Sequence, residues 1–194
     1  SASAKPMNRT IRIVASVLMI GGGLSLLLPL AIDYVGQRAY TLVFLLQALG
    51  FVMILGASLL SLSVFEHTLA RAMFVSGTAL WLLCWSGFLI GYFVPIPLAF
   101  WAALASLAFL TGVAVCLIRH EWTSAILASV LAGGSICSTL VMLLAAASLV
   151  SPDYSYVFFA LGAVAGGVLL VTLKWSARTS HDDGASPGFP AVRS

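Results

Sequence analysis

The chain has 194 residues, of which 61% are hydrophobic and 8% are charged, and its mean hydropathy is +1.11. Soluble globular domains carry about 25% charged residues, so this composition excludes the ordinary soluble classes and indicates an integral membrane protein. Nine basic residues against six acidic ones give a net charge of +3. The basic residues are scattered singly and form no patch, which excludes nucleic acid as an expected partner.

Six apolar blocks follow one another along the chain, and no Asp, Glu, Lys, Arg or His lies deep inside any of them. They occupy residues 11–32, 41–65, 69–94, 97–118, 123–150 and 154–173. About 20 residues at 1.5 Å each cross the hydrocarbon core as a helix, and the alternation typical of barrel strands is absent. The sequence therefore predicts an all-α membrane protein whose transmembrane domain, residues 11–173, contains six helices.

The connections between these blocks differ in charge from one side to the other. The turns near Gly36, Pro95 and Asp153 recur about every 59 residues, which predicts three short antiparallel hairpins. Arg38 is the one basic residue on that side. The remaining basic residues share the opposite side: Lys5, Arg9, Arg12, Arg71, Arg119, Lys174, Arg178 and Arg193. Because Lys and Arg are retained in the cytoplasm during insertion, both termini are expected there.

The two ends of the chain differ from the apolar domain. Residues 1–10 form a short cytoplasmic segment, and the first apolar block is too long for a cleavable signal peptide, which favours a signal anchor. Met7 with Asn8 and Arg9 would make an ordinary bacterial start, so residues 1–6 are either native or an appended sequence. Residues 174–194 are rich in Ser, Asp, Gly and Pro, which predicts a disordered cytoplasmic tail.

Small residues predict where helices approach one another. Gly162 and Gly166 form a GxxxG pair in the sixth block, and Gly133 lies in a run of small residues in the fifth. Such residues let helix backbones come close in a membrane. We therefore expect the fifth and sixth helices to pack together, with a seam between two copies of the chain as the alternative.

Five polar residues are candidates for a functional site. Gln47 lies well inside the second helix, where its amide must find a partner: either a neighbouring helix or a solute pathway. Glu66 and His67 lie in one cytoplasmic connection and His120 and Glu121 in another. If the two connections meet, these four side chains could bind a metal or exchange protons, or they could only mark the membrane interface.

No phosphate loop, zinc-ligand pair or nucleophile motif is present, so neither an enzyme nor a cofactor is expected. The six-helix pattern comes with a distinctive set of residues: Arg9, Arg12, Gly21, Gly22, Gly23 and Pro29. With its three short hairpins, the chain from Arg9 to Lys174 resembles the HdeD family of acid-resistance membrane proteins. The resemblance implies a stress-related, non-enzymatic role and carries over no catalytic residue.

Two functions follow as hypotheses. The first is a non-catalytic protein of the bacterial inner (cytoplasmic) membrane, either stress-associated or an accessory subunit of a larger membrane complex. Its partners would be the lipid bilayer and another membrane protein or a second copy of itself. The alternative is a small-molecule transporter or channel with a pathway near Gln47. A transporter should contain a polar cavity at mid-membrane depth, whereas an accessory subunit needs none.

Overall fold

The computed structural model describes residues 8–34, 40–89, 95–150 and 154–173. Within these ranges the chain contains no strand, and its α-helices are α1 (Arg9–Tyr34), α2 (Tyr40–Ser61), α3 (Thr68–Leu89), α4 (Pro95–Ile118), α5 (Trp122–Ala146) and α6 (Ser155–Thr172). The predicted all-α membrane fold with six helices is confirmed. The predicted disordered tail and the predicted turns near Gly36 and Asp153 lie outside the described residues, whereas Pro95, where the sequence predicts the middle turn, is already the first residue of α4.

Helix length agrees with a membrane-spanning role. Among the described residues, five helices (α1, α2, α4, α5 and α6) are long and apolar enough to cross a bilayer. The apolar part of α3 over its described side chains, Thr68–Cys84, is shorter. The whole of α3 nevertheless has 22 residues, or about 33 Å at 1.5 Å per residue, which matches a hydrocarbon core of about 30 Å.

The fifth helix ends earlier than its apolar sequence predicts. The apolar block continues to residue 150, but α5 ends at Ala146. Ser148 adopts a φ of 60° and donates its backbone N–H to Ala145 O, and Leu149 donates to Leu144 O. These bonds form a Schellman-type cap that closes the helix. Hydropathy could not reveal this stop because the residues beyond it are also apolar.

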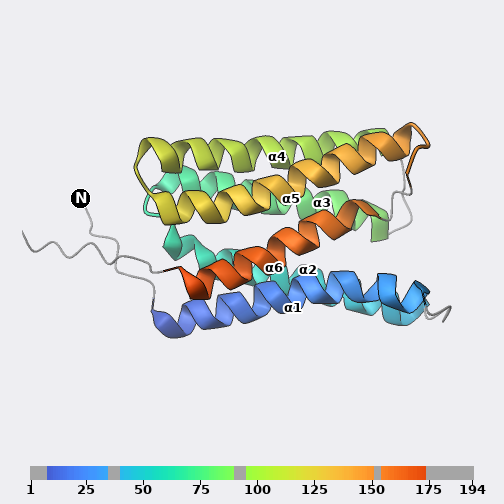
Figure 1. Ribbon diagram of the computed structural model, residues 1–194, viewed down its shortest axis with the longest axis horizontal. Helices are drawn as coiled ribbons and strands as arrows, with labels where there is room; N and C mark the ends of the chain where they lie inside the picture. Colours follow the sequence, from blue (N-terminus) through green and yellow to red (C-terminus); the bar gives the residue numbers. More distant parts are fainter. Residues whose placement is uncertain (1–7, 35–39, 90–94, 151–153, 174–194) are drawn as a thin grey trace, which may run out of the picture.

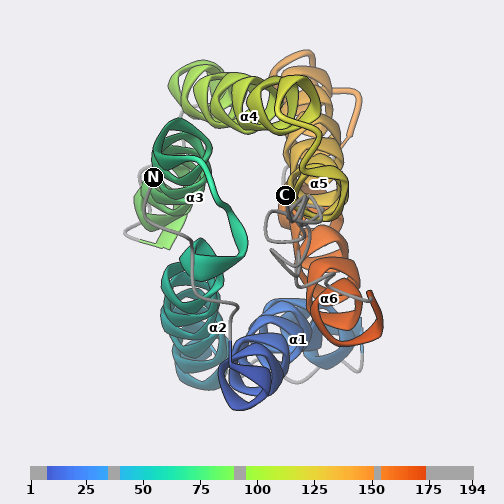
Figure 2. The same cartoon turned by 90° about the vertical axis from the view of Figure 1, so that its left-hand side faces the viewer.

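Viewed along their length, the helices form a closed ring in chain order (Figure 2). Neighbours in the sequence are neighbours in the ring, and α6 returns to pack along α1, whereas α2 and α3 touch much less. The start of α1, the end of α6 and the α2–α3 and α4–α5 connections all lie at one end of the ring (Figure 1). We call it the basic end, because every described basic residue lies there: Arg9, Arg12, Arg71 and Arg119.

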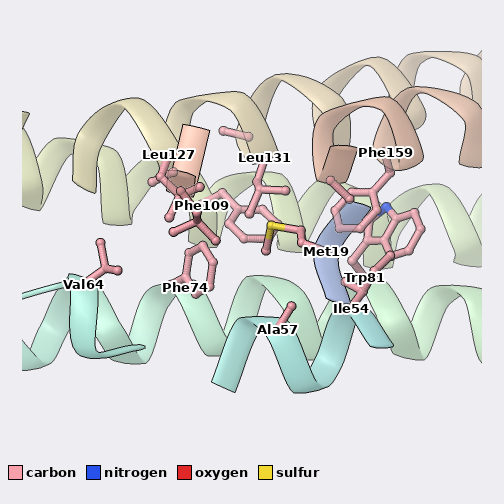
Figure 3. Packing of buried hydrophobic residues seen from close by; sticks show 14 of the residues in the cluster. Met19, Ile54, Ala57, Val64, Phe74, Trp81, Phe109, Leu127, Leu131 and Phe159 are labelled. Carbon is pink, nitrogen blue, oxygen red and sulfur yellow. The ribbon is translucent and has the colours of Figure 1, made fainter. Parts of the chain in front are cut away.

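Aromatic side chains fill the interior of the ring. Trp81 of α3 and Phe159 of α6, from opposite sides of the ring, stack with ring centroids 3.3 Å apart and planes 15° from parallel (Figure 3). Phe74 of α3 packs against Phe109 of α4 and against Phe65 at 4.7 Å. These rings belong to one buried cluster to which all six helices contribute. The interior is thus an apolar core that joins opposite walls of the ring.

Three consecutive glycines explain how α1 fits between two neighbours. A Cβ at Gly22 would lie 2.9 Å from Gly50 O of α2, and one at Gly23 would lie 2.7 Å from Ala160 O of α6. A Cβ at Gly21 would meet the end of the Met53 side chain, also on α2. Side chains at Gly22 and Gly23 would push the helices apart, because the atoms they would meet include backbone oxygens, whereas the end of Met53 could move aside for one at Gly21. The glycine run therefore lets α1 approach α2 and α6 closely at once.

Candidate functional site

The two polar connections predicted to form a site do meet at the basic end. The backbone N–H of Glu66 donates to Glu121 Oε2 at 3.2 Å, and Ser124 Oγ donates to Val64 O at 3.1 Å. Both bonds tie the α2–α3 connection, residues 62–67, to the start of α5. The connection therefore reaches inward from its own wall of the ring, as Figure 2 shows.

Phe65 anchors this connection in the interior. Its side chain is fully buried, and its carbonyl oxygen accepts a hydrogen bond from Arg71 Nε at 2.6 Å. The short 3₁₀ turn Leu62–Val64 leads the chain out of α2 and toward this position. α2 and α3 touch little along their lengths, and the connection between them is hydrogen-bonded to the start of α5.

The two histidines of the junction have identifiable local roles. His67 precedes α3, and its Nδ1 accepts a hydrogen bond from the backbone N–H of Leu69 at 3.3 Å, the geometry of a helix N-cap. His120 has a φ of 58° and lies two residues after the end of α4 at Ile118, and the next residue, Glu121, donates its N–H to Cys116 O at 2.8 Å. This is a C-terminal cap of the kind that glycine usually makes.

Two of the four side chains thus have a defined role: His67 caps α3, and Glu121 accepts the backbone N–H of Glu66. Glu66 and His120 are exposed, whereas His67 and Glu121 are half-buried. Among the described residues, no group of three or more His, Cys, Asp or Glu side chains is placed to hold a metal ion. Proton exchange by this group stays a prediction.

Gln47, the candidate inside the membrane, is buried with 8% of its surface exposed. It lies on the face of α2 that also carries Gly50 and Ile54, one and two turns further along, and these pack against α1. It is two helical turns from the start of α2, so it lies in the half of the ring remote from the basic end. This position suits a structural role between α1 and α2, and a role in a solute pathway stays a prediction.

A cluster of hydroxyl groups joins α4 to α5. Ser106 Oγ lies 2.9 Å from Ser135 Oγ and 3.3 Å from Thr139 Oγ1, and it donates to Ala102 O at 2.9 Å. Each hydroxyl thus has a partner across the seam or on its own helix. The cluster therefore joins the two helices by hydrogen bonds and is not a reactive site.

The glycine predictions for α5 and α6 are partly right. Gly162 lies against α5, where its Cβ would be 3.5 Å from Gly134 Cα, and Gly166 packs near Met19 of α1 and Leu127 of α5. The predicted part of Gly133 in the α5–α6 contact is wrong, because a Cβ there would meet nothing within 4 Å and the residue is exposed. Its neighbour Gly134 makes the contact, because a step of one residue rotates the side-chain direction by about 100° around the helix. A part for Gly133 in a seam between two copies of the chain stays a prediction.

Comparison with known proteins finds no matching family model, no matching curated protein and no matching solved structure. The resemblance to the HdeD family therefore stays a prediction from the residues.

Proposed function

We propose that this chain is a non-catalytic integral protein of the bacterial inner (cytoplasmic) membrane that works through its outer surface, as an accessory subunit bound to a larger membrane complex. The observation that carries the proposal is the stack of Trp81 on Phe159 across the middle of the ring. A solute path along the ring axis would have to separate this pair. A protein whose interior is closed and apolar would bind its partner through its outer surface.

Two further features support this proposal. The buried side chain of Phe65 and the α2–α3 connection lie over the interior at the basic end. A solute would therefore meet this obstruction in addition to the stack of Trp81 on Phe159. Among the described residues, no Asp, Glu, His, Lys or Arg side chain is buried. Proton-coupled transport generally uses a carboxylate or histidine inside the membrane.

The same proposal includes orientation and physiological setting. The basic end would face the cytoplasm, in agreement with the positive-inside rule, and both termini would be cytoplasmic. The resemblance to the HdeD family supports a role under stress, with acid as the first condition to examine.

Purification at native expression level in lipid nanodiscs, followed by quantitative mass spectrometry, tests this function. We expect one membrane protein to accompany the chain at a fixed ratio, before and after an acid shift. The chain alone, or a homo-oligomer without a partner under both conditions, would contradict the accessory role. A chain tagged at the opposite terminus serves as the control for binding through the tag.

A transporter or channel is the second candidate, and the burial of the Gln47 amide favours it. Solute uptake into proteoliposomes separates the two functions. A pathway past Gln47 predicts that Gln47→Leu abolishes uptake while Gln47→Asn, which keeps an amide, retains part of it. Equal uptake by the wild type, both variants and empty liposomes would exclude this pathway.

A further inference from the structure

An open cavity lies at the basic end, in the seam between α1 and α6. Its volume is about 120 Å³, several times what one water molecule needs, and it is lined by Arg9, Arg12, Ile13, Leu170 and Val171. One part of the wall is therefore cationic and the other is aliphatic. This combination suits a ligand with an anionic group attached to an apolar body.

Arg12 has an unused hydrogen-bond donor at this place. Its Nε is buried and has no hydrogen-bond partner among the described residues. A charged donor removed from water without a partner is unfavourable, so an acceptor in the cavity would stabilise it. Arg9 lies three residues earlier, on the same side of α1, and lines the same cavity. Two guanidinium groups at this spacing can share the oxygens of one phosphate.

The position of the two arginines along α1 indicates how deep the cavity lies in the bilayer. Arg9 is the first residue of the apolar span Arg9–Pro29, so the two arginines lie at the height of lipid headgroups. The seam beside them is held closed, because Ser16 Oγ donates to Gly167 O at 2.6 Å and a Cβ at Gly167 would lie 3.0 Å from Ser16 O. The cavity is thus the mouth of a tightly packed seam and not a gap between loosely associated helices.

We propose that this cavity binds the phosphate headgroup of an anionic phospholipid. Arg9 and Arg12 hold the phosphate oxygens, and Ile13, Leu170 and Val171 contact the glycerol and the first methylenes of the acyl chains. The bound lipid bridges α1 and α6, the first and last helices of the ring. Basic pockets between transmembrane helices are a known setting for anionic lipids.

Native mass spectrometry of the full chain in detergent tests this proposal. The probes are phosphatidylglycerol and phosphatidylcholine with identical acyl chains. We expect phosphatidylglycerol to bind preferentially, and Arg9→Gln and Arg12→Gln each to weaken it about fivefold, which corresponds to about 1 kcal/mol for each arginine at an anionic surface. Arg119→Gln is the matched control, because Arg119 is an exposed arginine at the same end and does not line the cavity.

A second pair of variants keeps both arginines. Val171 is 55% exposed and lines the cavity, whereas Val168 on the same helix is 47% exposed and does not. Val171→Phe should occupy the cavity and reduce phosphatidylglycerol binding, and Val168→Phe should leave it unchanged. Equal losses in the two phenylalanine variants, or equal losses in Arg12→Gln and Arg119→Gln, would overturn the proposal.

Inorganic phosphate distinguishes a lipid from a free anion. If the lipid is the ligand, millimolar phosphate should neither displace phosphatidylglycerol nor raise the melting temperature of the delipidated protein. Stabilisation by phosphate that depends on Arg12, without selectivity for phosphatidylglycerol, would refute the lipid assignment in favour of a soluble anion.

Discussion

A pair of adjacent glycines in α5 gives the sharpest test of the packing. Alanine in place of glycine within a helix is favourable by about 0.5–1 kcal/mol, and this gain applies equally to Gly133 and Gly134. At Gly134 the new Cβ would lie 2.9 Å from Phe158 O and 3.3 Å from Phe159 Cα, both backbone atoms of α6. Neither atom can move alone, so the two helices must separate, at an overpacking cost of about 1–3 kcal/mol.

Gly134→Ala should therefore be less stable than Gly133→Ala by about 1–3 kcal/mol. Thermal unfolding in one detergent measures the difference, and each kcal/mol corresponds to about 2–4 °C for a chain of this size. Gly133→Ala should melt at or slightly above the wild-type temperature, because nothing lies within 4 Å of its Cβ. If Gly133→Ala is as destabilising as Gly134→Ala, α5 does not pack on α6 through the face that carries Gly134.

Three other substitutions probe the core, the junction and the hydroxyl cluster. Trp81→Ala removes a fully buried ring from its stack on Phe159 and should cost about 3–5 kcal/mol in an unfolding titration. Glu121→Ala removes the acceptor of the Glu66 N–H at an exposed site, so hydrogen exchange of that amide should quicken by up to about tenfold. Ser106→Ala breaks hydrogen bonds between α4 and α5 and should cost about 0.6 kcal/mol, the average for such bonds in membranes.

Each of these variants has a matched control. Trp122 is 62% exposed, so Trp122→Ala should change stability by less than about 0.5 kcal/mol. Glu66→Ala keeps the backbone donor and should leave exchange at that position slow. Ser86 bonds to Leu83 O of its own helix, so Ser86→Ala should have a smaller effect than Ser106→Ala. If a control variant changes stability or amide exchange as much as its test variant does, the named contact is not the cause of the change.

Local features of the sequence were enough to predict the helices and part of the seams. Long apolar blocks without Asp, Glu, Lys, Arg or His predict transmembrane helices. A block of about 20 residues is long enough to cross the bilayer, and a helix satisfies its own backbone hydrogen bonds there. The spacing of Gly162 and Gly166 in a GxxxG pair predicts a helix contact from the sequence alone, and both residues do lie at helix contacts. The choice between Gly133 and Gly134 could not be made, because it depends on where α6 lies.

The candidate polar site was predictable as a set of residues but not as a geometry. Glu66 and Glu121 stand out in sequence as charges in neighbouring connections. Their hydrogen bond exists because the α2–α3 connection crosses toward α5, and Phe65 holds it there. A separation of 55 residues along the chain contains no information about that crossing.

The sequence by itself determined that the chain is a six-helix membrane protein and predicted that all its basic residues except Arg38 lie on one side. The tertiary structure decided the closed ring, the stack of Trp81 on Phe159 across it, and the cavity beside Arg12. The physical reason is that lipid and protein interior are equally apolar, so a membrane helix shows little contrast between its buried and exposed faces. Which side of each helix turns inward is settled by packing, and only the assembled ring reveals it.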